Sequence, residues 1–138
     1  MKIKPMIYQT DRKIELLYKD KYKNYNYYIL NLGTHPTAYI EIPKGNSLYE
    51  KHYDDIDILV HGGLTYSDHS LMMITSENWY IGWDYAHYDD YMTFMEDIYK
   101  DLKMPLHKWT TEEIIEECKN VIEQIIVLEG NNGETDKA

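Results

Sequence analysis

A histidine, two glycines and two hydroxyl side chains follow a short apolar run near the middle of the chain. The group comprises His61, Gly62, Gly63, Thr65 and Tyr66. Paired glycines let the backbone approach a ligand closely, and successive N–H groups can hold a phosphate or a carboxylate. The stretch is not a P-loop, because it lacks G-x-x-x-x-G-K-[ST] and no helical pattern follows it directly. The alternative interpretation is a glycine turn or bulge between strands, with His61 capping its backbone.

A second segment of similar design, W-Y-I-G-W-D-Y-A-H, runs from Trp79 to His87. Side chains alternate between the two faces of a strand. The alternation places Trp79, Ile81 and Trp83 on one face and Tyr80, Gly82 and Asp84 on the other. Exposed aromatic rings would stack on a base, which is worth roughly 1–3 kcal/mol per base. The alternative is that both tryptophans fill the core beneath a C-terminal helix. Gly82 is notable because a strand glycine often marks a close approach by ligand or backbone.

Histidine and aspartate side chains in the same segments could also hold a metal ion. The candidate ligands are His61, Asp84 and His87, with His52, His69 and Asp89 also suitable in type. Neither H-E-x-x-H nor a paired C-x-x-C is present, and the G-x-S-x-G elbow of a serine nucleophile is also absent. An acidic group at 54–57 could act as a general base beside His61, or it could only keep the surface charged. We therefore expect no catalytic residue and no cofactor.

Strand patterns fill the first part of the chain. Strands are predicted at 14–19, 25–32, 37–42, 56–60 and 79–84, with a hairpin turn at 20–24. A helix over 10–18 is the competing interpretation of the first strand, because its apolar residues also fit a helical face. Residues 67–78 are predicted to form a mobile loop.

A helix pattern with a clear start follows near the C-terminus. Thr110 and Glu113 have the spacing of a capping box, and Gly130 stands where the helix is expected to end. The apolar stripe comprises Ile114, Cys118, Val121, Ile122 and Ile125. Its position on this stripe makes Cys118 a buried structural thiol rather than a nucleophile.

The order of these elements predicts an α+β fold. We expect a single, mainly antiparallel sheet of about five strands, packed against the C-terminal helix and one less regular helix at 89–102. The expected divisions are a loose N-terminal arm at 1–12, one domain at 13–129 and a disordered tail at 130–138.

Composition narrows the classes of partner. The chain has 138 residues, a formal net charge of -10 and one cysteine. An acidic surface argues against binding to DNA or RNA, which needs a basic one. The apolar runs are too short for a transmembrane helix, no signal-peptide pattern is present, and a single cysteine excludes an internal disulfide. We expect a cytoplasmic protein that binds neither nucleic acid nor membrane.

Four segments together resemble a known group of sequences. They are A-Y-I-E-I-P-K-G-N-S-L-Y at 38–49, Y-D-D-I-D-I-L-V-H-G-G-L-T-Y at 53–66, I-G-W-D-Y-A-H at 81–87 and W-T-T-E-E-I-I-E-E-C-K at 109–119. This ordered set resembles small accessory proteins encoded by bacteriophages and prophages of low-GC Gram-positive bacteria. The resemblance covers most of the chain, from Tyr27 to Ile126, and implies a counter-defence role in the cytoplasm of a bacterial host. It transfers no catalytic residues, because the family offers none.

The leading hypothesis is a non-enzymatic protein that sequesters a small nucleotide-derived immune signal. Its binding residues would be His61, Gly62, Gly63, Thr65, Tyr66, Asp84 and His87, with Tyr53 and Lys44. Lysines and glycine amides would have to offset the acidic charge, in one arrangement across a homo-oligomer interface. One alternative is a protein–protein inhibitor that meets a host defence protein with an acidic, tyrosine-rich surface. The other is a metal-dependent hydrolase centred on His61, Asp84 and His87.

Overall fold

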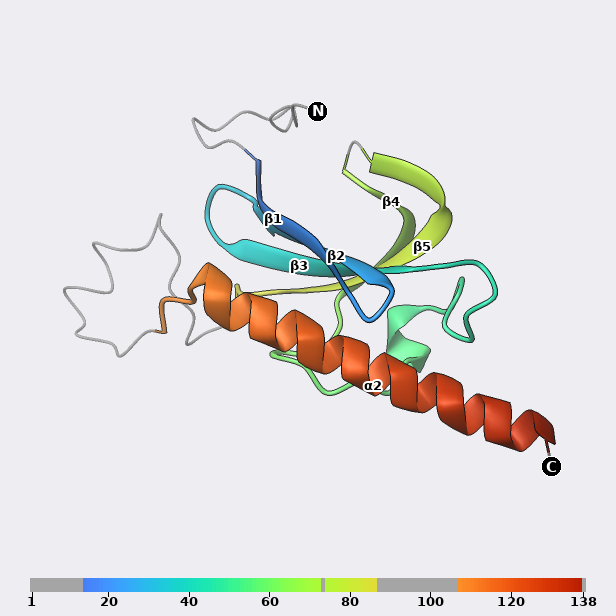
Figure 1. Ribbon diagram of the computed structural model, residues 1–138. Coiled ribbons are helices and arrows are strands. Elements are labelled where there is room, and N and C mark those ends of the chain that lie inside the picture. The colour runs from blue at the N-terminus through green and yellow to red at the C-terminus, as the bar shows by residue number, and fades with distance from the viewer. Residues whose placement is uncertain (1–13, 73, 87–106, 138) are drawn as a thin grey trace.

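A five-stranded antiparallel sheet carries one long helix across one of its faces (Figure 1). The computed structural model describes residues 14–72, 74–86 and 107–137. The elements are β1 (Glu15–Tyr22), β2 (Tyr25–Asn31), β3 (Pro36–Ile42), the 3-10 turn η1 (Tyr53–Asp55), β4 (Tyr66–Leu71), β5 (Ile74–Asp84) and α2 (Thr111–Lys137). The strand order is β1-β2-β3-β5-β4, and each neighbouring pair is antiparallel. The predicted α+β class is therefore confirmed.

Two residues form the turn between β1 and β2. Lys23 and Asn24 have φ angles of 46° and 73°, and the flanking Tyr22 and Tyr25 face each other as the last pair of the ladder. Positive φ at both central residues is typical of the tight hairpin turn whose twist matches that of the strands. The hairpin prediction is thus confirmed over the competing helix, although the turn is shorter than predicted.

The last strand in sequence lies inside the sheet rather than at its edge. β5 pairs with β3 on one side and with β4 on the other, so its backbone is hydrogen-bonded along both edges. A long connection over 43–65 separates β3 from β4 and lets β5 take this central position. The predicted alternation along β5 is confirmed, because Ile81 and Trp83 face α2 while Tyr80 faces the other side of the sheet.

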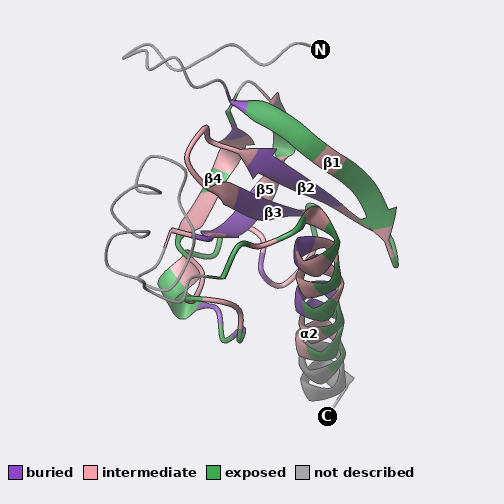
Figure 2. Ribbon diagram, turned by 90° about the vertical axis from the view of Figure 1, so that its left-hand side faces the viewer, coloured by how far each residue is buried: buried purple, intermediate pink, exposed green. Residues whose placement is uncertain are grey.

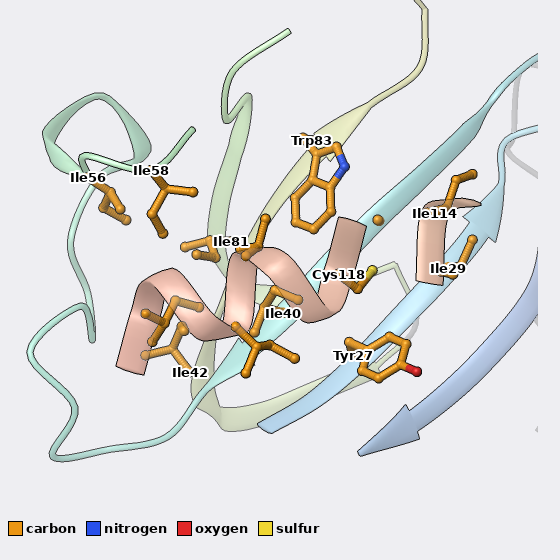
Figure 3. Packing of buried hydrophobic residues seen from close by; sticks show 14 of the residues in the cluster. Tyr27, Ile29, Ile40, Ile42, Ile56, Ile58, Ile81, Trp83, Ile114 and Cys118 are labelled. Carbon is orange, nitrogen blue, oxygen red and sulfur yellow. The ribbon is translucent and has the colours of Figure 1, made fainter. Parts of the chain in front are cut away.

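The main core lies between the sheet and α2 (Figure 3). The predicted stripe on the helix is confirmed, because Ile114, Cys118, Val121, Ile122 and Ile125 are all buried against the strands. Burial raises the pKa of the Cys118 thiol, as expected for an inert structural cysteine. The capping box is also confirmed: the Glu113 N–H donates to Thr110 Oγ1 at 3.2 Å, and the Thr110 N–H donates to Glu113 Oε1 at 3.0 Å.

A second, smaller core covers the opposite face of the sheet. It comprises Tyr28, Leu30, Tyr39, Leu71 and Tyr80, all buried. Figure 2 shows the difference in burial across the sheet: β2, β3 and β5 contain buried stretches, whereas the outer strand β1 is mostly exposed. The tyrosines of this face are structural, since Tyr28 donates its hydroxyl to Glu41 at 2.6 Å and Tyr80 exchanges a hydrogen bond with Ser76 at 3.0 Å.

The strand predicted at 56–60 is wrong. This segment is irregular, although Ile56 and Ile58 are buried and Asp57 and Leu59 are exposed in alternation. Alternation alone does not make a strand, because a strand also needs a neighbouring strand to satisfy its backbone. Here a helix side chain supplies those hydrogen bonds instead, as described below.

The mobile loop predicted at 67–78 is also wrong. These residues form most of the antiparallel hairpin of β4 and β5. The sequence of β4 is rich in polar residues and therefore lacks the apolar pattern of a strand. β4 lies at the edge of the sheet, where charged and polar side chains are common. The number of strands agrees with the prediction because one strand was missed and another was wrongly assigned.

The C-terminal helix is longer than predicted. α2 continues past Gly130 to Lys137, so the expected end at Gly130 is wrong. A glycine inside a helix costs only about 1 kcal/mol relative to alanine, which does not by itself terminate one. The helix predicted at 89–102 and the arm at 1–12 lie outside the described residues, and the predicted domain limits stay predictions.

Candidate functional site

The predicted binding turn is a tight backbone turn. The Gly63 N–H donates to the Val60 carbonyl at 2.9 Å, and Gly62 and Gly63 have φ angles of 69° and 82°. Both angles lie in the left-handed region that glycine enters without steric cost. The Gly63 amide is therefore engaged inside the turn, which weakens its predicted use as a docking group for an anion.

His61 packs into a three-ring cluster with Tyr85 and Trp109. Its ring stacks on Tyr85 with centroids 5.0 Å apart and an interplanar angle of 9°. Trp109, just before α2, lies 4.8 Å from each of the other two rings. Tyr85 is fully buried; its hydroxyl donates to Glu117 and accepts from Trp83 Nε1 at 2.9 Å. Burial first, and the Glu117 hydrogen bond second, raise the pKa of Tyr85.

Thr65 and Asp84 come together near the end of β5. The Thr65 hydroxyl donates to Asp84 Oδ2 at 3.1 Å, and Asp84 Oδ1 accepts the Ala86 N–H at 3.1 Å. Tyr66 lies on the same side of the sheet and meets the Tyr39 ring edge-on, with centroids 5.3 Å apart. The structure thus groups Thr65, Tyr66 and Asp84, and gives each of them a contact within the protein.

The proposed metal ligands do not form a site among the described residues. His61 stacks on Tyr85, which packs in the core beside α2. Asp84 is the last residue of β5 and follows Trp83, which faces α2, so the Asp84 side chain points to the other face of the sheet. No group of three or more histidine, cysteine, aspartate or glutamate side chains in the described ranges could hold a metal ion. His87, the third predicted ligand, lies outside those ranges.

The weaker candidates, Lys44 and Tyr53, lie elsewhere. Lys44 approaches Glu77 near the start of β5, with 4.0 Å between Nζ and Oε2. At about 3.3 Å per strand residue, Glu77 is on the order of 20 Å from Asp84. The Tyr53 N–H donates to Ser67 Oγ at 3.1 Å on β4. The predicted site residues that lie in the described ranges are therefore spread over both faces and both ends of the sheet.

His69 lies on β4, in the segment predicted to be a mobile loop, and both nitrogens of its ring have partners. His69 Nε2 lies 2.8 Å from Glu50 Oε2, and His69 Nδ1 lies 3.1 Å from the Asn78 carbonyl oxygen. Both partners are hydrogen-bond acceptors, so only the protonated, cationic imidazole can donate to both of them at once. Trp79 and Tyr49 meet its ring edge-on. With both nitrogens engaged, His69 fastens the loop around Glu50 to the sheet and has no nitrogen left to act as a base.

The stability that His69 supplies should depend on pH. The Glu50 hydrogen bond first, and the Asn78 carbonyl second, raise the pKa of His69 from its usual 6.5. Because the folded-state pKa is raised, the stabilisation is complete below about pH 6.5 and is lost as pH rises through the raised value. We expect Glu50→Gln to lower the pKa of His69 in an NMR titration and to shrink the loss of stability at alkaline pH.

The matched control for this prediction is Glu77→Gln. It removes a carboxylate from the neighbouring strand β5 that approaches Lys44, whereas the hydrogen bonds of the His69 ring go to Glu50 and Asn78. The His69 pKa should stay at its wild-type value in this variant. An unchanged His69 pKa in Glu50→Gln would contradict the conclusion that the Glu50 hydrogen bond stabilises the protonated imidazole.

Gln124 on α2 holds the irregular segment 56–60 in place. The Leu59 N–H donates to Gln124 Oε1 at 2.8 Å, and Gln124 Nε2 donates to the Leu59 carbonyl at 2.7 Å. Gln124 Nε2 also donates to Asn120 Oδ1 at 2.8 Å. One side-chain amide thus takes the place of a neighbouring strand, and the Leu59 side chain is left facing outward.

A groove runs between this segment and the second half of α2. It contains a cavity of about 290 Å³ lined by Asp57, Asn120, Glu123, Gln124, Val127 and Leu128. Leu59 is 82% exposed and Val127 is 60% exposed, so large apolar side chains face solvent beside the acidic ones. In Figure 1, α2 extends beyond the sheet toward its C-terminal end. We call this feature the α2 groove.

Sequence reasoning missed the α2 groove. In the sequence, Asp57 stands out only as part of the acidic group at 54–57, and Gln124 and Val127 belong to none of the predicted patterns. The available signal was Val127 and Leu128, two apolar residues that continue the helix beyond the predicted stripe. Such residues are typical of a helix that is contacted on a second side.

No family model, curated protein or solved structure matches the chain. Among the described residues, no helix is long and apolar enough to cross a membrane. The functional argument therefore rests on the geometry of the described residues.

Proposed function

We propose that the chain is a non-catalytic binding protein whose partner is another protein, held at the α2 groove. The observation that carries the proposal is the exposure of Leu59 and Val127 on a surface where two hydrogen bonds of Gln124 join α2 to the segment 56–60. Exposed apolar side chains rimmed by polar ones mark interaction sites. A preformed surface also loses less conformational freedom when it binds.

The size and charge of the groove favour a protein over a nucleotide. A cavity of about 290 Å³ lies at the small end of the range for ligand pockets, and it suits one anchoring side chain of a larger partner. Asp57 and Glu123 line it, and the chain as a whole carries a net charge of -10. An anionic ligand would meet repulsion there.

The resemblance to phage accessory proteins would make the partner a host defence protein. On this proposal the chain acts in the cytoplasm of an infected bacterium and blocks its partner by occupying a surface. Such action requires no catalytic residue. It also agrees with the placement of His69 and Asp84, whose side chains make contacts inside the fold.

An affinity experiment with three baits tests the proposal. Wild-type protein, the Leu59→Gln/Val127→Gln variant and the Glu15→Lys variant are immobilised at equal loading and exposed to the same bacterial lysate. We expect the wild type and Glu15→Lys to retain a stoichiometric protein that the double variant loses by at least about tenfold. The retained protein is then purified and the comparison repeated with the two components alone.

Glu15→Lys is the matched control because Glu15 is exposed on β1, at the opposite end of that strand from the turn beside α2. It changes the charge of the protein without touching the α2 groove. Equal retention by all three baits would contradict the proposal, as would the absence of any retained protein.

A second candidate function, binding of a nucleotide-derived signal, is favoured by the three-ring cluster. His61 and Trp109 are partly exposed beside the Gly62–Gly63 turn, and a base could stack on them. Thermal melting with cyclic nucleotides and ADP-ribose-type compounds, together with mass spectrometry of denatured protein, tests this candidate. A melting shift that Trp109→Ala abolishes would support it, and no shift with any compound would count against it.

A further inference from the structure

We infer that the occupant of the α2 groove is a cationic amphipathic helix of the partner, with a lysine or arginine that reaches Asp57 and apolar side chains that cover Leu59 and Val127. This inference rests on the proposed function and adds the chemistry of the partner. It depends on three features of the groove: its closed backbone, its unpaired carboxylate and its exposed apolar side chains.

The closed backbone favours a helix over a strand. An extended segment such as 56–60 would ordinarily accept a partner strand through its N–H and carbonyl groups. Gln124 already occupies both groups of Leu59, at 2.8 and 2.7 Å. At Leu59 a partner therefore binds through side chains, as a helix does when it lies in a groove.

The charge of the groove selects a basic partner. Of its two carboxylates, Glu123 is already paired with Lys23, with 2.7 Å between Oε1 and Nζ. Asp57 is exposed and makes no hydrogen bond or ion pair with any residue in the described ranges. A lysine or arginine brought to Asp57 would therefore form a new ion pair without breaking an existing one.

Apolar contact supplies the other half of the match. Leu59 is 82% exposed, Val127 is 60% exposed, and Leu128 lines the same groove. Burial of such side chains contributes about 25 cal/mol per Å² of apolar area. A second copy of this chain fits less well, because two chains that each carry a charge of -10 would repel one another.

Three model peptides test the inference by fluorescence anisotropy with the full chain. The first is an amphipathic lysine–leucine helix. The second has the same leucine positions with glutamate in place of lysine, and the third is a scrambled lysine–leucine sequence without an apolar face. We expect the first peptide to bind at least about tenfold more tightly than either of the others.

Variants of the chain then localise the binding. Asp57→Asn removes the charge and keeps nearly the same side-chain shape. It should weaken the binding of the lysine–leucine peptide by about three- to tenfold. Asp55→Asn, a matched change of an exposed carboxylate in η1, should leave affinity within about twofold. Leu59→Gln/Val127→Gln should weaken binding by about tenfold or more.

Four results would overturn the inference. Equal binding of the scrambled peptide, or equal effects of Asp57→Asn and Asp55→Asn, would show attraction to overall charge rather than recognition at the groove. A natural partner that depends on Leu59 and Val127 but not on Asp57 would also reject it while leaving the proposed function standing. A natural partner whose binding does not depend on Leu59 and Val127 would reject both the inference and the proposed function.

Discussion

Replacing Trp83 with alanine should lower the free energy of unfolding by about 3–5 kcal/mol. Trp83 is 1% exposed and packs between the sheet and α2 (Figure 3). Its Nε1 donates to the Tyr85 hydroxyl at 2.9 Å, so truncation also removes a buried hydrogen bond. The loss is a large part of the 5–15 kcal/mol that stabilises a typical domain. Urea denaturation followed by circular dichroism measures it.

Trp79→Ala is the matched control, because it removes the same side chain from the same face of β5. Trp79 is only partly buried and donates its Nε1 to the Lys51 carbonyl at 3.0 Å near the surface. We expect a loss of about 1–2 kcal/mol. Equal losses for the two variants would contradict the central position assigned to Trp83.

Gly82→Ala should lower the free energy of unfolding by about 3 kcal/mol. A Cβ built at Gly82 would lie 2.4 Å from Tyr39 Cδ1 and 2.8 Å from the Ala38 carbonyl oxygen. The Tyr39 ring cannot swing aside freely, because the Tyr66 ring packs against it edge-on. The close approach predicted at this glycine is therefore made by a protein side chain and by backbone of β3.

A double-mutant cycle separates the two clashes. In a Tyr39→Ala background, Gly82→Ala should cost less, because only the clash with the Ala38 carbonyl remains. Gly130→Ala provides the opposite control, since nothing lies within 4 Å of a Cβ there and the glycine is helical. It should stabilise the protein by about 0.5–1 kcal/mol. A Gly82→Ala variant of wild-type stability would contradict the packing described.

Local patterns in the sequence predicted much of the fold. The capping box at Thr110 and the stripe that includes Cys118 defined α2, because a helix satisfies its own backbone and needs only one apolar face. The hairpin at Lys23–Asn24 was likewise local. The segment 56–60 was assigned wrongly because its partner is a side chain 65 residues away. No local pattern reports a contact of that kind.

The candidate site was harder to predict than the fold. His61 stacks on Tyr85 in the core beside α2, whereas Asp84 faces the other side of the sheet and bonds to Thr65. The glycine pair predicts a backbone that binds an anion, but the Gly63 N–H donates to the Val60 carbonyl inside the turn. The sequence could not predict the α2 groove, because Asp57 and Val127 are far apart in the chain. They line the same groove only because α2 packs beside the irregular segment 56–60.

Site-specific photo-crosslinking in bacterial cells tests the central claim most directly. A photoreactive residue is placed at position 59 or 127 in the α2 groove, or at position 15 on β1 as the control. The account predicts one discrete, heavier adduct from positions 59 and 127 and none from position 15. An absence of adduct from both groove positions, or equal adducts from all three, would contradict a protein partner at the α2 groove.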